Sequence, residues 1–343
     1  MFNLESIVRK NILNLKPYSS AREEFRGEAM AYLDANENPY NKGLNRYPDP
    51  LQNDLKEKIA EMKEVSVPEI FLGNGSDEPI DLLIRVFCEP RIDNIVAIDP
   101  TYGMYKVAAD INGVEYRKVL LSDDFKLIAQ RIIDECDAKT KLIFLCSPNN
   151  PTGNLLDTGE VIKILKAFKG IVILDEAYID FAQVPGFLPK LKSYPNLVIL
   201  QTFSKAWGLA SIRLGMAFAS EEIINLLNKI KYPYNINQLT QQHALEAIKS
   251  ASNKMDWLEK ILKERDRLMN SLKELSLVNQ VSDTDANFFL VHVNDPKKIY
   301  RLLVERGIIV RDRSSVSLCE GCLRITVGTP DENDLLINAL KSI

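Results

Sequence analysis

Five side chains of different chemistry follow three short apolar runs in this 343-residue sequence. An amide comes after residues 142–145, a carboxylate and a phenol after 171–174, and an amine and a guanidinium after 197–200. They are Asn150, Asp175, Tyr178, Lys205 and Arg213. A lysine confined in a protein pocket loses proton affinity, and its amine can form an imine with a carbonyl carbon. The set therefore indicates amine chemistry assisted by charged and hydrogen-bonding partners.

The elements that must position these side chains can be predicted from the apolar runs. The runs are bounded by polar or turn residues and separated by helix-length segments such as residues 155–168. Such a pattern is typical of buried, mostly parallel strands with crossover helices. In an open parallel sheet, ligands bind beyond the carboxyl ends of the strands. We therefore expect the five side chains at one edge of a sheet. Runs predicted as strands are 95–98, 142–145, 171–174, 197–200 and 214–219.

The second half of the chain has a different pattern. Long helical stretches run from Thr240 to Leu275, and shorter strand-like pieces follow. A chain of this length is expected to form one large and one small domain. We predict an α/β large domain over residues 40–255. Residues 256–343 are expected to form a smaller α+β domain that packs with the N-terminal arm, residues 1–39.

Composition argues against nucleic acid and membranes as partners. The formal net charge is −4, so no long-range attraction to polyanions is expected. No apolar run approaches the ~20 residues that a membrane span requires. Near the N-terminus, Leu4, Ile7, Val8 and Ile12 have helical spacing broken by charges, which predicts a surface helix rather than a signal peptide. We expect a cytoplasmic protein that acts on small molecules.

The five cysteines are odd in number and scattered, which suits free thiols in a reducing compartment. Cys319 and Cys322 form a lone CxxC motif. A zinc site would need a second pair or nearby histidines, and the sequence has only His243 and His292. No metal is predicted.

The strand-end set resembles the fold-type-I pyridoxal-phosphate enzymes, whose fold is that of aspartate aminotransferase. The resemblance implies that Lys205 holds pyridoxal 5′-phosphate as an imine and that Asp175 keeps the pyridine nitrogen protonated. Tyr178 and Asn150 would hydrogen-bond the ring's phenolate oxygen. Tyr102 would stack on the ring face. The order, residue types and strand-end placement agree, which makes the combination far more specific than its parts.

The same resemblance implies where the cofactor phosphate binds. The glycine turn at residues 73–77 opens a predicted helix and offers backbone N–H groups to an anion, although alone it could be a simple connector. Hydroxyl and guanidinium donors complete the set. Residues implied in phosphate binding are Ser76, Asp77, Thr202, Ser204 and Arg213.

Over nearly its whole length, the chain is similar to the histidinol-phosphate aminotransferase family. That family moves an amino group between L-glutamate and imidazole-acetol phosphate in histidine biosynthesis, giving 2-oxoglutarate and L-histidinol phosphate by a ping-pong mechanism. The nearest alternatives are an aromatic aminotransferase and a decarboxylase of a phosphorylated amino acid on the same fold. The segments that carry the resemblance are 15–22, 33–39, 45–49, 286–289, 310–313 and 322–329.

The resemblance also implies substrate-binding residues. Both substrates are dianions, so paired guanidinium groups can serve both half-reactions. Arg311 and Arg324 are the candidates, and Arg324 matches the position that binds the substrate α-carboxylate in the wider family. Tyr18 would reach the substrate phosphate from the N-terminal arm, Asn36 lies in the entrance segment, and Asn287 would lie near the substrate.

Three further residues complete the prediction. Tyr47 matches a tyrosine that contacts the cofactor phosphate of the neighbouring subunit, which implies a homodimer with shared sites. Arg313 is expected to form a surface ion pair and is given no role in the site. Glu176, which lies between two predicted site residues, is expected to be structural.

Overall fold

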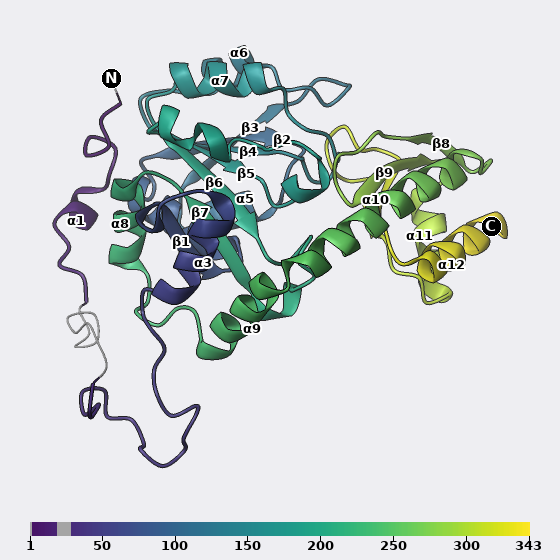
Figure 1. Ribbon diagram of the computed structural model, residues 1–343. Helices are drawn as coiled ribbons and strands as arrows, with labels where there is room; N and C mark the ends of the chain where they lie inside the picture. The colour runs from purple at the N-terminus through teal and green to yellow at the C-terminus, as the bar shows by residue number, and fades with distance from the viewer. Residues whose placement is uncertain (1, 19–28) are drawn as a thin grey trace.

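A computed structural model describes residues 2–18 and 29–343. The last four residues of the 15–22 segment therefore lie outside the described residues. Figure 1 shows a large domain of sheet and helices, and a smaller domain connected to it by the long helix α10 (Ala251–Lys273). None of the helices in the described residues is long and apolar enough to cross a membrane.

The described part of the large domain contains a seven-stranded sheet with the order β1-β7-β6-β5-β4-β2-β3. The five strands from β6 to β3 in this order are parallel, and β7 runs antiparallel to both of its neighbours. The prediction of a mostly parallel central sheet is thus confirmed. The strands are β1 (Ile70–Asn74), β2 (Asn94–Asp99), β3 (Glu115–Leu120), β4 (Thr140–Cys146), β5 (Ile171–Asp175), β6 (Leu197–Thr202) and β7 (Leu214–Phe218).

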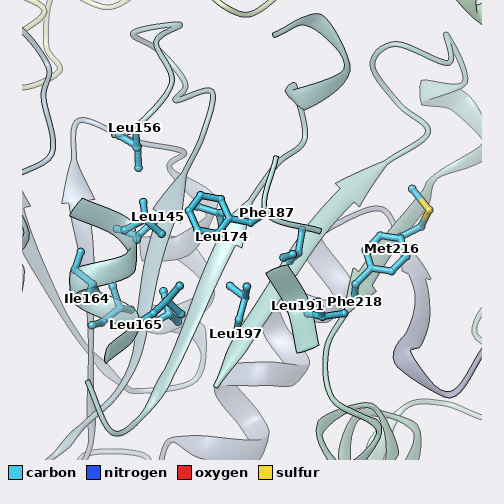
Figure 2. Close-up of a cluster of buried hydrophobic side chains, with 14 of the residues drawn as sticks. Leu145, Leu156, Ile164, Leu165, Leu174, Phe187, Leu191, Leu197, Met216 and Phe218 are labelled. Atoms are coloured by element: carbon cyan, nitrogen blue, oxygen red, sulfur yellow. The ribbon is translucent and has the colours of Figure 1, made fainter. Parts of the chain in front are cut away.

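Both faces of this sheet are covered, which explains why its strands are apolar on both sides. On one face, alternate strand residues pack against α3 (Asn53–Lys63), α6 (Ala129–Glu135), α7 (Thr158–Ala167) and α9 (Gln238–Lys249). The other residues pack against α4 (Asp77–Phe87), α5 (Met104–Ile111) and α8 (Glu221–Ile230). Figure 2 shows part of the first cluster, in which Leu145, Leu174 and Leu197 line the face that Ile164 and Leu165 of α7 cover. Each fully buried leucine contributes about 1.5–3 kcal/mol to folding.

The small domain is an antiparallel sheet covered on one face by helices. Its described strands are β8 (Val278–Val281), β9 (Phe288–Val293), β10 (Arg311–Asp312) and β11 (Cys322–Thr326), in the order β10-β11-β9-β8. The helices are the C-terminal half of α10, α11 (Pro296–Glu305) and α12 (Pro330–Lys341). The predicted boundary at residue 255 falls inside α10, which runs without interruption from one domain to the other (Figure 1).

The N-terminal arm differs from its prediction. Its only regular element in the described residues is the short α1 (Lys10–Leu13), rather than a helix that includes Leu4. Val8 and Ile12 are buried in the apolar cluster of α4 and α8, and Arg9 Nε lies 3.0 Å from Glu89 Oε2. The arm therefore packs on the large domain instead of the small one, because that surface offers both apolar and charged partners. Helices α1 and α12 lie on opposite sides of the molecule in Figure 1.

Candidate active site

The predicted site residues converge because β4, β5 and β6 are adjacent and parallel. Cys146 pairs with Asp175, and Asp175 pairs with Leu200, so the three strands end at the same edge. The segments that follow these strands carry Asn150, Tyr178 and Lys205. Asn150 Nδ2 lies 3.4 Å from Tyr178 Oη, to which it donates a weak hydrogen bond. Lys205 Nζ lies 5.5 Å from the centre of the Tyr178 ring.

Asp175 is the buried carboxylate of this cluster. Tyr105 Oη donates a 2.6 Å hydrogen bond to Asp175 Oδ2, and the Ala177 amide donates to Oδ1 at 3.1 Å. Burial raises the pKa of Asp175, and the Tyr105 hydrogen bond opposes that rise because it stabilises the charged form. A cationic partner would likewise favour the carboxylate. The protonated nitrogen of a pyridine ring is such a partner.

Tyr105 was not among the predicted site residues. It lies in α5, and its ring stacks on Phe144 of β4 at a centroid distance of 4.7 Å. Tyr102, the predicted ring-stacking residue, contacts the Tyr105 ring edge-on at 5.6 Å. A tyrosine three positions after Tyr102 at the start of a helix faces the same side, and this spacing was the available signal.

Lys205 is exposed to solvent, with two guanidinium groups and the two carboxylates of Asp175 and Asp77 around it. Partial burial lowers the pKa of Lys205, the guanidinium groups of Arg324 and Arg213 lower it further, and Asp175 opposes them. Burial disfavours the charged amine, and each of these cations repels it. More of the lysine is therefore in the neutral, nucleophilic form at a given pH.

An anion cradle lies where α4 begins. Gly75 has a φ of +69°, and a Cβ at this position would collide with the Arg213 guanidinium. Glycine is required here because it permits this close approach. Ser76 is at the N-cap position of α4 and makes no side-chain cap hydrogen bond, and the first N–H groups of a helix are suited to bind an anion. The backbone N–H groups at a helix N-terminus and a guanidinium group together form a suitable set of hydrogen-bond donors for a phosphate monoester.

Further side chains complete the cradle. Thr202 Oγ1 and Ser204 Oγ lie 3.1 Å apart at the end of β6. Asp77 accepts hydrogen bonds from Tyr102 Oη at 3.0 Å and from Arg213 Nη2 at 3.4 Å. The Asp77 carboxylate thus holds the predicted stacking ring and the predicted phosphate guanidinium together. The residues present fit pyridoxal 5′-phosphate at both its ring and its phosphate ends.

Arg324 connects the small domain to this cluster. Its Nη1 donates a 2.6 Å hydrogen bond to Asn150 Oδ1. Its guanidinium carbon lies 5.4 Å from the centre of the Phe288 ring, and that ring contacts the Tyr178 ring edge-on at 5.0 Å. Phe288 was not predicted as a site residue, although it lies beside Asn287. Burial lowers the pKa of Arg324, which nevertheless remains charged because its ordinary pKa is so high.

Arg311 and Arg313 lie beside Arg324. Arg311 pairs directly with Arg324 in the β10–β11 register. The expectation that Arg313 forms a surface ion pair is wrong. The residue is half-buried, and its Nε has no hydrogen-bond partner among the described residues. Burial lowers the pKa of Arg313, and the nearby Arg324 and Arg311 lower it further.

The remaining predicted substrate residues are placed differently. Tyr18 is exposed and lines a hollow of about 530 Å³ next to α8. Asn36 is exposed, with a φ of +55°. Tyr47 stacks on Tyr234 at 4.4 Å rather than on a residue of the cluster. Asn287 is half-buried at the start of β9, and its carbonyl accepts the Val327 amide at 2.9 Å. The roles of these four residues stay predictions.

Glu176 lies next to Asp175 in the chain but faces away from the cluster. The Phe187 amide donates to its Oε1 at 2.7 Å, and Gln201 Nε2 donates to its Oε2 at 3.0 Å. Burial raises the pKa of Glu176 from 4.5 to about 7. These contacts connect β5, β6 and the segment before Phe187, which supports the structural interpretation of this residue.

The raised pKa of Glu176 predicts pH-dependent stability. The folded state holds this proton more tightly than the unfolded state, so the contribution to stability is fully present below about pH 4.5. It is lost as the pH rises through about 7. Between pH 5 and 8, this group should lower the free energy of unfolding of the wild type by on the order of 2 kcal/mol. We expect Glu176→Gln not to show this decrease. Thermal unfolding across that range measures it, with the exposed Glu222→Gln as control. Equal slopes for wild type and Glu176→Gln would contradict the assignment.

The fold and the site define a pyridoxal-phosphate-dependent aminotransferase of fold type I. Comparison with known families agrees, because the model described as aminotransferase class I and II matches residues 28–340. The predictions of fold class, enzyme class and cofactor are confirmed.

The relatives narrow this class further. The histidinol-phosphate aminotransferase of Parabacteroides distasonis is 58% identical, covering 100% of this chain and 99% of the relative. The chain belongs to the histidinol-phosphate aminotransferase family, as the sequence motifs predicted. Among solved structures, the Clostridium acetobutylicum enzyme of the same name has a TM-score of 0.81 at 27% identity, covering 88% of this chain and 91% of that one. The Sinorhizobium meliloti enzyme, in complex with pyridoxal-5′-phosphate, has a TM-score of 0.78 at 25% identity, with coverages of 87% and 82%.

Proposed function

We propose that this enzyme transfers an amino group between L-glutamate and imidazole-acetol phosphate, forming 2-oxoglutarate and L-histidinol phosphate. One observation carries the proposal: Arg311 and Arg324 are paired across β10 and β11, and Arg324 reaches Asn150 in the cluster that contains Lys205. A ping-pong enzyme must accept both substrates in one pocket. Two adjacent guanidinium groups can bind either the carboxylates of glutamate or the phosphate of the other substrate.

Pyridoxal 5′-phosphate, when bound, supplies an electron sink for the breaking bond at the substrate carbon. We propose that Lys205 Nζ holds the cofactor and then moves the proton at that carbon, which its lowered pKa favours. The Asp175 carboxylate would hold a proton at the ring nitrogen. Tyr178 and Asn150 would donate to the ring oxygen, and Tyr102 would cover the ring face.

The phosphate of the cofactor would bind in the cradle at the start of α4. Its donors would be the N–H groups of Ser76 and Asp77, the hydroxyls of Thr202 and Ser204, and the guanidinium of Arg213. Fixing the phosphate sets the orientation of the ring relative to Lys205, and such positioning is a large part of catalysis.

Substrate orientation would depend on the small domain. Arg324 is held by Asn150 and by the Phe288 ring, so it can fix a substrate carboxylate relative to the ring plane. Asn287 would contact the substrate from the start of β9. Tyr18 and Asn36 would approach from the N-terminal arm.

We also propose a homodimer in which Tyr47 contacts the cofactor phosphate of the neighbouring subunit. Leu33, Tyr40 and Leu44, which precede Tyr47 in the chain, are largely exposed, and a second copy would cover this apolar surface. A cytoplasmic location is proposed as well, since all five cysteines are free.

An absorbance spectrum of the purified holoenzyme tests the function. Adding L-histidinol phosphate should bleach the visible band of the bound cofactor and raise the band of its amine form. Bleaching with glutamate but not with histidinol phosphate would reject this substrate and retain the aminotransferase. Carbon dioxide release would indicate the decarboxylase instead, and a preference for phenylpyruvate would indicate an aromatic aminotransferase. A protein that stays colourless with added pyridoxal phosphate would reject the whole assignment.

A further inference from the structure

Arg313 faces the same side of the small sheet as the two predicted substrate arginines. Arg311 pairs with Arg324, and Asp312 pairs with Leu323. The Arg313 amide donates to the Cys322 carbonyl at 2.9 Å, which extends this register by one position. Paired residues share a face, and alternate residues of a strand share a face. The three arginines therefore project from one face.

That face points to the large domain. Arg324 on this face donates to Asn150 Oδ1 at 2.6 Å. The opposite face carries Leu323 and Ile325, which are buried against the helices of the small domain. Arg313 thus lies on the side of the sheet that faces the cluster around Lys205. Burial raises the pKa of Tyr178 in that cluster, and the nearby positive charges of Arg324 and Arg313 oppose the rise.

No carboxylate in the described residues neutralises this group of arginines. Neither Arg311 nor Arg313 forms an ion pair there, and the Nε of Arg313 is buried without a hydrogen-bond partner. Elsewhere in the chain, half-buried arginines do have such partners, as in the pair between Arg117 and Glu115. Buried polar groups are normally hydrogen-bonded, so an unpaired donor next to two further cations is well suited to bind an anion.

We infer that Arg313 binds the phosphate of the phosphorylated substrate and is a specificity-determining residue of the enzyme. This inference rests on the proposed function. A carboxylate carries one charge and two oxygens, which one bidentate guanidinium satisfies. A phosphate monoester carries close to two charges and three terminal oxygens at pH 7. Arg313, added to the pair of Arg311 and Arg324, matches that larger demand.

The test compares the two half-reactions of the holoenzyme in wild type and Arg313→Gln. We expect the KM for L-histidinol phosphate to rise about tenfold or more, which corresponds to the loss of a charged hydrogen-bonding group. The KM for glutamate should change less than about threefold, and kcat should change little. Arg301→Gln is the matched control, because Arg301 lies on α11 with its side chain 70% exposed and should leave both values unchanged.

Two further measurements distinguish a failure of the Arg313 inference from a failure of the proposed function. Inhibition of the glutamate half-reaction by inorganic phosphate should weaken in Arg313→Gln, whichever phosphorylated compound is the substrate. Arg313→Lys keeps the charge without the fork and should give an intermediate KM. Equal increases for both substrates, or unchanged phosphate inhibition in a variant that unfolds at the wild-type temperature, would overturn the inference. Wild-type enzyme that ignores histidinol phosphate, yet loses phosphate inhibition in Arg313→Gln, would reject only the proposed function.

Discussion

Lys205→Ala is expected to lower kcat by about a thousandfold or more, because removing a general base alone typically costs 10²–10⁴-fold. The variant also loses the amine that holds the cofactor. Asn150, Tyr178 and Arg324 keep their mutual contacts without this lysine, so the site should still bind substrate. Steady-state turnover with histidinol phosphate and 2-oxoglutarate measures the effect.

The control for Lys205 separates charge from chemistry. Lys205→Arg preserves a cation near Asp175 but cannot become neutral at working pH, so its turnover should be as low as that of Lys205→Ala. Lys192→Ala, an exposed lysine outside the site, should retain full activity. Substantial turnover in Lys205→Ala would show that another group transfers the proton, and the mechanism would have to be abandoned.

Asp175→Asn is expected to have the second largest effect, with kcat reduced at least about a hundredfold. The carboxylate is 3% exposed, and a neutral amide cannot stabilise a protonated ring nitrogen beside it. The affinity for pyridoxal phosphate should fall as well. Titration of the apoenzyme with cofactor, together with turnover at saturating cofactor, separates the two contributions.

Two further variants serve as comparisons for Asp175→Asn. Tyr105→Phe removes only the 2.6 Å hydrogen bond to the carboxylate and should weaken cofactor binding by roughly tenfold. Asp157→Asn changes an aspartate that caps α7 far from the chemistry, where asparagine is an equally good cap, and should be neutral. Wild-type kcat in Asp175→Asn at saturating cofactor would be incompatible with the assigned role.

The central part of the fold and site was predictable because it depends on local pattern. The runs at β4, β5 and β6 are uninterrupted and apolar, and the chain places Asn150, Asp175 and Lys205 just beyond their ends. Parallel pairing of neighbouring strands then brings these residues to one edge. Strands β1 and β3 were missed. For β3 the cause is clear: it is an edge strand whose residues are mostly exposed or half-buried, so no apolar run marks it.

What was not predicted depends on contacts between distant segments. Tyr105 becomes a site residue only because α5 packs over β4 beside Asp175. Arg313 looks like any charged loop residue until the β10–β11 pairing and the lack of a carboxylate in the described residues around it are seen. The N-terminal arm could have packed on either domain, and spacing alone could not decide between two apolar surfaces.

The uninterrupted helix α10 gives the enzyme a mechanical property. With 23 residues it is about 35 Å long at 1.5 Å per residue. Its N-terminus adjoins α9 at Ser250, and its other end carries the sheet with the three arginines. A rotation of about 5° at Ser250 would therefore displace the far end by roughly 3 Å, about the length of one hydrogen bond. In such a rotation the helix would act as a lever, and a substitution near Ser250 would change the position of the arginines without contacting the substrate.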